Sequence, residues 1–583
     1  MKNLTSVLFL YTVCFLNITY SQTFTRITDT SNPVVTDQHE SGGGCWVDVN
    51  NDGWLDLFVA NGNLISQNNS LYINRRDGNF TKVITGAVVN DGGSSIGGAF
   101  SDYNNDGNPD LFVTNRNFFK NFFYNGNGDS TFIKVITGNI VTDSANSNCG
   151  HWVDIDKDGD LDLFVLNFQG NDFLYLNSGA PLYNFTKIDT AAFLLNAGDF
   201  SIPASWGDYN NDRLPDLFVG NAGIQNDFIY KNNGNLSFTR TTINDGRSTL
   251  GASFGDYNND GNLDLFAANF LNQNNILYKN SGSPDFIFTP IDTGIVSNNG
   301  GSSVGSCWGD VDNDGDLDLF VSNDNGENNF LYLNNGAPGY GFTRIITGAI
   351  VNDGGNSFGS VFGDYNNDGA IDLFVANRLN QNNFLYLNNG NGNKWLGIKC
   401  RGTVSNRSAI GTKVKVKAII NGQSLWQIRE VQSQSGYNSE NLDLNFGLGN
   451  STIVDSIIIN WISGTTSVFT NQSVNRYITI SEDGTINSIK NNNLVPDKFT
   501  LYQNYPNPFN PSTIIKFALV NSGNVTFKIY DELGREIKTL VNEFMNTGTY
   551  EITVNGKDLV SGIYFYRIEM GNLIEAKKML LIK

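Results

Sequence analysis

The sequence of 583 residues predicts an all-β protein, made of a seven-bladed β-propeller, a small β-domain and a β-sandwich-like C-terminal domain. The first observation behind this prediction is an acidic loop that recurs seven times. It starts at Asp48 and returns after steps of 54, 52, 54, 48, 54 and 54 residues. A period of this size is typical of repeat architectures, in which one supersecondary unit packs on the next.

The second observation is that each repeat divides into four short strand-like segments. In the fifth copy these are GASFGD, DLFAANF, NILYKN and FIFTPI. Clusters of Gly, Asn and Asp separate them, as expected of strands joined by tight turns. Four strands per unit and seven units predict a propeller of seven blades.

The third observation is the offset of the fourth-strand signature, which begins with Phe in every copy. The first copy, FTRI at Phe24, precedes the first acidic loop, and no copy follows the seventh loop. The others begin at Phe80, Phe132, Phe185, Phe238, Phe288 and Phe342. We therefore expect the N-terminal strand to complete the last blade, which would leave no open edge between the first and last blades.

The acidic loop has the chemistry of a calcium site. In DYNNDGNLD, at Asp256–Asp264, side-chain oxygens stand at positions 1, 3, 5 and 9, and Gly261 stands at position 6. Ca²⁺ takes six to eight oxygen ligands, and glycine allows the chain to turn sharply between them. We predict up to seven bound Ca²⁺ ions. The candidate ligands are Asp48, Asn50, Asp52, Asp56, Asp102, Asn104, Asp106, Asp110, Asp154, Asp156, Asp158, Asp162, Asp208, Asn210, Asp212, Asp216, Asp256, Asn258, Asp260, Asp264, Asp310, Asp312, Asp314, Asp318, Asp364, Asn366, Asp368 and Asp372.

The fourth loop departs from the others, because Arg213 replaces the glycine at position 6. A residue with a Cβ disfavours the turn, and a nearby cation opposes a metal ion. We expect the Asp208 loop to be the weakest site, or empty.

The composition supports metal sites and argues against nucleic-acid binding. The formal net charge is -20, although only 16% of the residues are charged. Asp fills 23 of the 28 candidate ligand positions, and seven divalent cations would change the net charge from -20 to about -6. Nucleic-acid binding needs a basic surface.

The N-terminus, residues 1–21, has the pattern of a secretory signal peptide. Lys2 supplies a positive charge, VLFLYTVCFL is apolar, and Ser21-Gln22 is a plausible cleavage point. No other segment predicts a transmembrane span. Outside this segment we expect Cys45, Cys149, Cys307 and Cys400 to be free thiols, the first three of them buried.

Residues 22–391 resemble the FG-GAP and VCBS-type repeats of integrin α-subunit propellers. Each copy has an aromatic residue two positions before its first Asp and an apolar run ending in Asn after its loop, such as LFVAN at residues 57–61. The resemblance implies that the calcium loops join the first two strands of each blade on one face. The opposite face would carry Asn-rich loops, as at Asn61–Asn69, and NDGG runs, as at Asn90–Gly93. It is the candidate face for an extracellular protein or glycan partner.

Residues 392–482 resemble the ASPIC/UnbV domain, which follows a calcium-binding propeller in cartilage acidic protein-like molecules. The matching residues are Asn406–Gly411, Arg429-Glu430-Val431, Ser435-Gly436-Tyr437, Phe446–Gly449 and Trp461. Arg407, Arg429 and Glu430 could form an internal ion-pair set or a binding patch, and the structural role is favoured.

The polar composition of residues 483–497 predicts a linker. Residues 498–583 resemble the C-terminal sorting domain of the type IX secretion system. The matching residues are Tyr505–Pro511, Gly534 and Ser561–Tyr564. The resemblance implies recognition by that secretion machinery and export across a bacterial outer membrane. The mature protein would be released or attached at the cell surface.

Three functions remain open from the sequence: a non-enzymatic calcium-binding protein for adhesion or binding, a lectin-like propeller that binds glycans between blades, and a polysaccharide-degrading enzyme. The first is favoured. The chain has two His residues, His39 and His151, and no recognisable zinc site or Ser-His-Asp motif. We expect His151 to be a packing residue. Paired carboxylates for glycoside hydrolysis are defined by distance and stay an open alternative.

Overall fold

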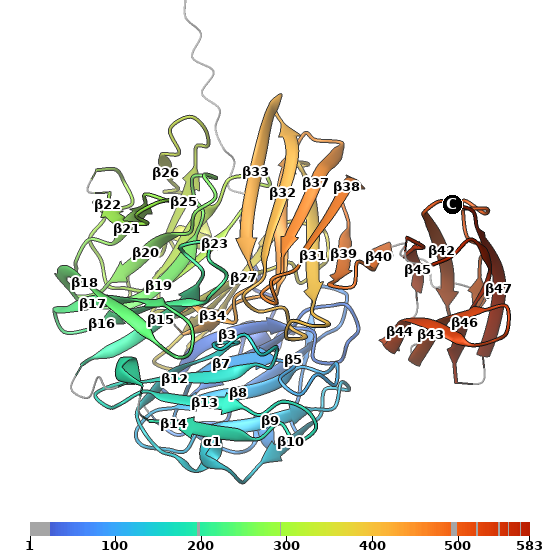
Figure 1. Cartoon of the computed structure of the whole chain (residues 1–583). Coiled ribbons are helices and arrows are strands. Elements are labelled where there is room, and N and C mark those ends of the chain that lie inside the picture. Colours follow the sequence, from blue (N-terminus) through green and yellow to red (C-terminus); the bar gives the residue numbers. More distant parts are fainter. Residues whose placement is uncertain are drawn as a thin grey trace, which may run out of the picture.

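The computed structural model describes residues 24–63, 65–189, 191–194, 199–291, 293–435, 437–490, 498–520, 523–545, 548–557, 559–571 and 573–583. Strands dominate these residues, which confirms the all-β prediction (Figure 1). The proposed signal sequence lies outside the described residues. Among the described residues, no helix has both the length and the apolar character needed to span a membrane.

The N-terminal two thirds of the chain form a series of four-stranded antiparallel repeat sheets, numbered here in chain order. Their strands are β3 (Ser41–Val47), β4 (Asp56–Asn61), β5 (Ser70–Asn74) and β6 (Phe80–Lys82); β7 (Ser95–Ser101), β8 (Asp110–Asn115), β9 (Phe122–Gly126) and β10 (Phe132–Val135); β11 (Ser147–Val153), β12 (Asp162–Asn167), β13 (Phe173–Asn177) and β14 (Phe185–Ile188); β15 (Ser201–Gly207), β16 (Asp216–Asn221), β17 (Gln225–Asn232) and β18 (Phe238–Arg247); β19 (Thr249–Gly255), β20 (Asp264–Asn269), β21 (Ile276–Asn280) and β22 (Phe288–Pro290); β23 (Ser303–Gly309), β24 (Asp318–Asn323), β25 (Phe330–Asn334) and β26 (Phe342–Arg344); and β27 (Ser357–Gly363), β28 (Asp372–Asn377), β30 (Phe384–Asn388) and β1 (Phe24–Arg26).

The N-terminal strand β1 completes the seventh repeat sheet, as the offset of its signature predicts. Phe24 pairs with Asn388 and Arg26 with Tyr386 across the β1–β30 ladder. A second pairing between the N-terminal residues and the seventh repeat is that of β2 (Gln38–His39) with β29 (Gln381–Asn382). These pairings join the two ends of the repeat region.

The first strands of the repeat sheets contact one another in a closed series. Strands β3, β7, β11, β15, β19, β23 and β27 each contact the next, and β27 returns to β3. The second residue of five of these strands meets in one buried apolar cluster, made of Ile96, Ile202, Leu250, Val304 and Phe358. The repeat sheets therefore surround a common centre (Figure 1).

Short helical turns fill the gaps between neighbouring repeat sheets. They are η1 (Pro33–Val35), η2 (Ala87–Val89), α1 (Asn139–Thr142), η3 (Ala192–Leu194) and η4 (Ala349–Val351). Each buries two apolar side chains, such as Val88 and Val89 between the first and second sheets. Burial of branched aliphatic side chains stabilises the contact by about 1.5–3 kcal/mol each.

The region after the repeats forms a small β-domain, called here the cap domain. One sheet runs β33 (Gln423–Glu430), β32 (Lys413–Ile420), β37 (Ile453–Asn460) and β38 (Thr466–Ser473). A second contains β36 (Asp443–Gly449), β31 (Lys394–Arg401), β39 (Tyr477–Ser481) and β40 (Ile486–Lys490). The cap domain stands on the repeat region (Figure 1), and its apolar core is continuous with that of the second and third repeat sheets.

A hairpin of the cap domain enters the centre of the repeat region. Its strands β34 (Gln434–Ser435) and β35 (Asn438–Ser439) pair with β15 and β3 respectively. Between them Tyr437 is buried in the central apolar cluster, with its ring centroid 4.8 Å from that of Phe358. Arg116 donates to the Tyr437 hydroxyl at 3.3 Å. The hairpin therefore anchors the cap domain at the centre.

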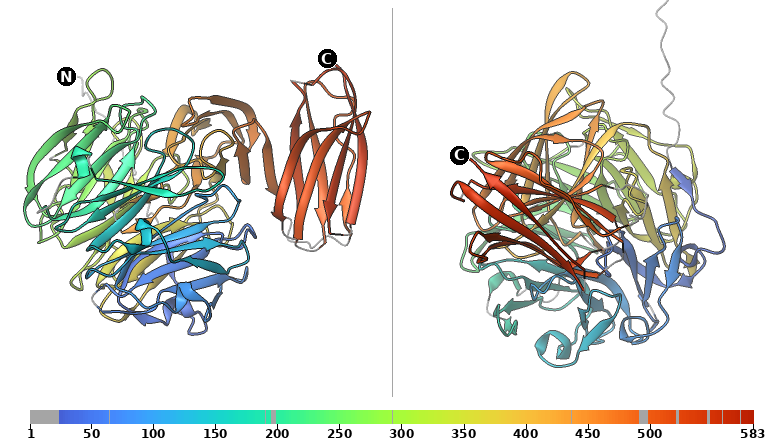
Figure 2. Two further views of the ribbon diagram at one scale, coloured as in Figure 1. Left: turned by 60° about the horizontal axis from the view of Figure 1, so that its bottom comes forward. Right: turned by 90° about the vertical axis from the view of Figure 1, so that its right-hand side faces the viewer.

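The C-terminal residues surround a core of their own (Figure 2), with three strands that continue the second sheet of the cap domain and four that form a separate sheet. The strands are β41 (Thr500–Leu501), β42 (Ser512–Leu519) and β45 (Gly548–Asn555), then β43 (Gly523–Asp531), β44 (Glu536–Met545), β46 (Gly562–Met570) and β47 (Leu573–Leu581). Strand β40 falls inside the predicted linker 483–497 and pairs with both β39 and β45. Part of that segment is thus a strand that joins the cap domain to the C-terminal sheets.

The four cysteines predicted to be free thiols are indeed free in the described part of the chain, and all four are buried. Burial raises the pKa of Cys45 to about 12. Buried thiols of this kind are inert packing groups.

We predict that His151 makes stability fall as the pH is lowered. It is fully buried on β11, beside the backbone of Gln434. Burial lowers the pKa of His151 to about 3, whereas unfolded His titrates near 6.5. The unfolded chain therefore takes up a proton first, so this contribution is fully present above pH 6.5 and is lost as the pH falls towards about 3. At pH 5 the loss is about 2 kcal/mol.

The comparison of the wild type with His151→Phe by urea unfolding at pH 7.5 and pH 5.0 measures this contribution. The variant should lose about 2 kcal/mol less than the wild type between the two pH values. An identical pH dependence in both proteins would show that His151 is not buried as the neutral imidazole.

Candidate metal loops

Every predicted loop lies between the first and second strands of its repeat sheet, where the sequence placed it. In the fifth loop, the Asp260 N–H donates to Asp256 Oδ1 at 3.0 Å and to Asn258 Oδ1 at 2.9 Å. The Gly261 N–H donates to Asp256 Oδ2 at 3.0 Å. The same three bonds recur in the first, second, fourth, sixth and seventh loops. Backbone donors thus curl each of these loops around its own carboxylates.

The Asp at position 9 of each loop is at most 1% exposed. Asp264 has no exposed surface, and its Oδ1 accepts the Asn280 N–H at 2.7 Å. In the first, third, sixth and seventh loops the equivalent Oδ2 accepts a backbone N–H, but Oδ2 of Asp264, Asp110 and Asp216 is buried with no hydrogen-bond donor among the described residues. Burial raises the pKa of each of these three groups to about 9. A buried carboxylate oxygen without a donor is costly, and a cation in the loop would satisfy it.

Two loops bring carboxylates close enough to share one ion. In the third loop, oxygens of Asp154, Asp156 and Asp162 all lie within 4.8 Å of one another, and in the sixth loop those of Asp310, Asp312 and Asp314 do the same. An all-oxygen donor set with several charges fits a hard divalent cation such as Ca²⁺. The carboxylates of these two loops therefore fit the Ca²⁺ ions that the sequence predicts.

Asn at position 4, which sequence analysis did not select, links neighbouring loops. The Asn259 side chain donates to Gly315 O at 3.1 Å and to Asp316 Oδ1 at 2.7 Å in the next loop. Asn367 donates to Gly53 O at 2.9 Å, which connects the seventh loop to the first. These Asn residues have φ values from 54° to 61°, a conformation that Asn tolerates better than most residues. The sequence signal for this link between loops is the Asn that recurs at position 4 of the DxxNDG pattern. Lys157 takes this position in the third loop.

The cap domain contacts several loops through the first Asp. Arg407 Nε lies 2.8 Å from Asp102 Oδ2, and the Tyr477 hydroxyl donates to Asp364 Oδ2 at 2.6 Å. The ion pair expected for Arg407 is structural, but its partner is a loop of the repeat region and not a residue of the cap domain. The loop face of the repeats is therefore a domain interface.

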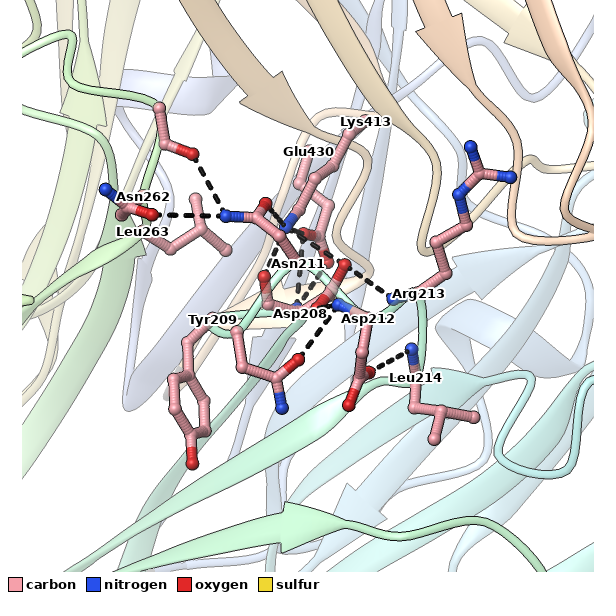
Figure 3. Close-up of polar contacts among 12 residues, drawn as sticks. Asp208, Tyr209, Asn211, Asp212, Arg213, Leu214, Asn262, Leu263, Lys413 and Glu430 are labelled. Atoms are coloured by element: carbon pink, nitrogen blue, oxygen red, sulfur yellow. Dashed lines mark hydrogen bonds and ion pairs between the residues drawn. The ribbon is translucent and has the colours of Figure 1, made fainter. Parts of the chain in front are cut away.

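The fourth loop holds a cation from the protein itself (Figure 3). Lys413 of the cap domain is buried, and its ammonium donates to the Asp208 carbonyl and to Asn211 Oδ1, the latter at 2.7 Å. It also lies 3.1 Å from Asp208 Oδ2 and 3.8 Å from Glu430 Oε2. The Glu430 carboxylate in turn accepts the Asp208 N–H at 3.2 Å. Sequence analysis gave no role to Lys413.

Arg213 does not place its charge in the fourth loop. Its backbone takes the left-handed conformation that the turn requires, with φ of 67°. Its guanidinium turns away (Figure 3) and donates to the Gly464 carbonyl and to Thr466 Oγ1 of the cap domain. The expectation that Arg213 places its charge beside this loop is wrong, because Arg213 joins the two domains and Lys413 supplies the cation.

Family models match three parts of the chain. The model described as FG-GAP-like repeat matches residues 48–113, 102–165, 154–219, 208–267, 256–321 and 310–375, which together span more than half of the chain. The model for ASPIC and UnbV matches residues 402–487. The model for the secretion system C-terminal sorting domain matches residues 503–583. No curated protein matches the sequence.

Two solved structures are similar to this chain at low scores. AofleA from Arthrobotrys oligospora is 12% identical over 54% of this chain and 89% of its own, with a TM-score of 0.32. A tetra-tandem repeat from the extending region of a large adhesion protein is 10% identical over 93% of this chain and 99% of its own, with a TM-score of 0.12. Scores this low carry no argument about fold or function.

Proposed function

Because this chain belongs to the FG-GAP-like repeat family, we propose that it is an exported, calcium-stabilised seven-bladed β-propeller that serves as a binding or adhesion scaffold. In this proposal the repeat sheets are the blades, and each acidic loop between the first two strands of a blade is a calcium site. The observation that carries the proposal is the convergence of carboxylate oxygens within one loop, since those of Asp154, Asp156 and Asp162, and those of Asp310, Asp312 and Asp314, lie within 4.8 Å of one another.

The closed series of contacts among the first strands supports the blade count. The pairing of β1 with β30 supports it further, since this exchange ties the first residues of the ring to its last sheet. The bond from Asn367 to Gly53 adds a link between the seventh and first loops. A ring closed in this way presents two faces of loops on a rigid frame, which is the usual platform for recognition.

The two faces differ in what they offer a partner. The cap domain contacts the acidic loops through Arg407, Lys413 and Tyr477, so this face is used within the chain. The Asn-rich loops between the second and third strands lie at the other ends of the blades. We propose that an extracellular protein or glycan is recognised from that side and not through the calcium loops.

The C-terminal sorting domain supports export by the type IX secretion system. We propose that residues 1–21 direct the chain across the inner membrane and that the sorting domain then directs it across the outer membrane. The mature protein would act outside the cell, where calcium is abundant enough for sites with dissociation constants of about 10⁻⁴ to 10⁻³ M.

We predict that the purified protein binds six Ca²⁺ ions and not seven. Lys413 is only 5% exposed and already supplies a buried positive charge to the fourth loop, so a second cation beside it would be repelled. The cations beside the first and second loops, Arg76 and Arg407, are 38% and 26% exposed and can move aside for a metal ion. Native mass spectrometry after buffer exchange into calcium, with magnesium as the control ion, counts the bound ions. A count of seven ions would show that Lys413 does not exclude the metal. A count of zero ions would overturn the calcium proposal.

A further inference from the structure

A cavity of about 560 Å³ opens between the fourth and fifth repeat sheets. Ile229, Ile243 and Ile276 are part of its apolar lining, together with Phe286 and Phe288, and Asp245 and Asp285 supply carboxylates. Cavities of this volume, apolar with a few polar groups, are typical of ligand sites. This cavity coincides with the short step of 48 residues between the fourth and fifth acidic loops.

The first group missing from this gap is the apolar plug that fills the others. Elsewhere the segment that leads into a new sheet buries one or two apolar residues between the sheets. These are Val34 and Val35, Val88 and Val89, Ile140 and Val141, Phe193 and Leu194, Val296, and Ile350 and Val351. In the short step, β18 instead continues along β17 to Arg247, and β19 starts at Thr249. From this segment only Ile243 packs on the local core of the described residues.

The second missing group is a cation. In every repeat sheet the Tyr of the third strand faces a residue of the fourth strand, and in six of the seven sheets that residue is Lys or Arg. The pairs are Tyr72 with Lys82, Tyr124 with Lys134, Tyr175 with Lys187, Tyr230 with Arg240, Tyr332 with Arg344, and Tyr386 with Arg26. In the fifth sheet Tyr278 faces Pro290, which carries no charge.

In four sheets this cation neutralises an Asp that also accepts the Tyr hydroxyl. Lys134, for example, lies 2.7 Å from Asp91, which accepts from Tyr124 at 2.6 Å. The related pairs are Lys82 with Asp37, Lys187 with Asp143, and Arg26 with Asp353. The NDGG runs supply two of these carboxylates, Asp91 and Asp353, and a cation lies beside the carboxylate in four of the seven repeat sheets.

Asp245 accepts a hydrogen bond from a Tyr hydroxyl, as in four other sheets, but no Lys or Arg stands at the paired position of the fourth strand. It accepts from the Tyr278 hydroxyl at 3.1 Å and lines the cavity. Burial and the charge on Asp245 raise the pKa of Asp227 behind it, and burial raises the pKa of Asp245 as well. Arg247 also lines the cavity, but it donates to the Asn274 carbonyl. Among the described residues no Lys or Arg makes a salt bridge with Asp245.

We propose that this cavity binds a segment of a partner protein that presents a Lys or Arg side chain next to a branched aliphatic residue. The aliphatic group would replace the missing plug, and the cation would take the place that Pro290 leaves empty beside Asp245. In the described part of the chain β18 pairs only with β17, so its outer edge is open to an extended backbone. The inference rests on the proposed binding role and names its site, but it does not depend on the metal loops.

The test uses the full chain and a fluorescent peptide, TGAIVKDG, which copies residues 347–354 with Lys in place of Asn352. Fluorescence anisotropy should show saturable binding by the wild type. Changing the peptide Lys to Gln, or Ile-Val to Asn-Asn, should weaken binding about tenfold or more, because a charge-assisted hydrogen bond or the apolar contact is lost.

Two protein variants and one control locate the peptide. Pro290→Lys restores the residue type of the other sheets and should weaken peptide binding about tenfold by filling the site from within. Asp245→Asn should do the same by removing the charge. Thr289→Lys adds the same charge at the neighbouring exposed position and should leave binding unchanged. Each variant should keep the melting temperature shift that calcium gives the wild type.

Equal binding by the wild type and Pro290→Lys, or no saturable binding up to about 1 mM peptide, would overturn the inference. If the calcium shift persists in either case, the proposed scaffold stands and only the ligand site is wrong. If the peptide binds as expected but calcium has no effect on melting, the cavity stands and the calcium proposal fails.

Discussion

Removal of calcium with EGTA is expected to lower the stability of the repeat region by about 8 kcal/mol relative to a tenfold excess of calcium over its dissociation constant. Each site that binds only the folded chain contributes about 1.4 kcal/mol under that condition, and six sites add together. The physical cause is the set of buried carboxylates, since Asp264 has no exposed surface and an oxygen with no donor in the described part of the chain. Differential scanning calorimetry in calcium, in magnesium and in EGTA measures the shift.

Two matched variants show whether the effect comes from the loops. Asp264→Asn should remove one calcium ion from the count and about 1.4 kcal/mol of the calcium-dependent stability. Asp216→Asn changes the equivalent residue in the fourth loop, where Lys413 lies beside Asp208, and should leave the ion count unchanged. A melting curve that is the same in calcium and in EGTA would contradict the prediction that these loops bind stabilising calcium ions.

Replacement of Lys413 by Ala is expected to lower the free energy of unfolding by about 3–5 kcal/mol, the range for a buried ion pair that loses one partner. Both the lysine and its neighbours are buried: the Lys413 side chain is 5% exposed and that of Glu430 is 3% exposed. Burial already raises the pKa of Glu430 to about 7, although Lys413 opposes the rise. Without Lys413, the Asp208 and Glu430 carboxyl groups would face each other with no cation between them.

Urea unfolding without added calcium measures this loss. Lys417→Ala is the matched control, because Lys417 lies on the same strand over the Trp426 ring at 5.7 Å and should cost only about 1 kcal/mol. Lys413→Ala should also open the fourth loop to a metal, so that native mass spectrometry counts one more calcium ion and calcium restores part of the lost stability. If the variant is as stable as the wild type and binds no additional ion, Lys413 does not act as the cation of that loop.

Much of the repeat region could be predicted because its signals are local. The four segments of each repeat, the acidic loop between the first two, and the turn at Gly261 all follow from neighbouring residues whose spacing fixes which groups can meet. The N-terminal strand could be predicted as well, since the signature at Phe24 has no counterpart after the seventh loop and its place on β30 was the position left vacant.

The cap domain shows where this reasoning ends. Arg407 and Glu430 were recognised as members of a charged set, but their partners lie in loops that are far away in the sequence. Lys413 and Asp208 are separated by 205 residues, and Arg116 and Tyr437 by 321. No periodicity or spacing relates such pairs, because the packing of one domain on another decides them.

The sequence by itself determined the strands, the loop chemistry and the completion of the last sheet by β1. These features follow from repeated local patterns, from the oxygen ligands that a loop offers and from the one strand position that the last repeat lacks. The tertiary structure decided the rest. It set a lysine of the cap domain into the loop whose glycine is missing, placed Tyr437 in the central cluster, and put Pro290 beside Tyr278 where the other sheets have a cation. Each of these depends on which surfaces come into contact, and that is fixed only when the whole chain has folded.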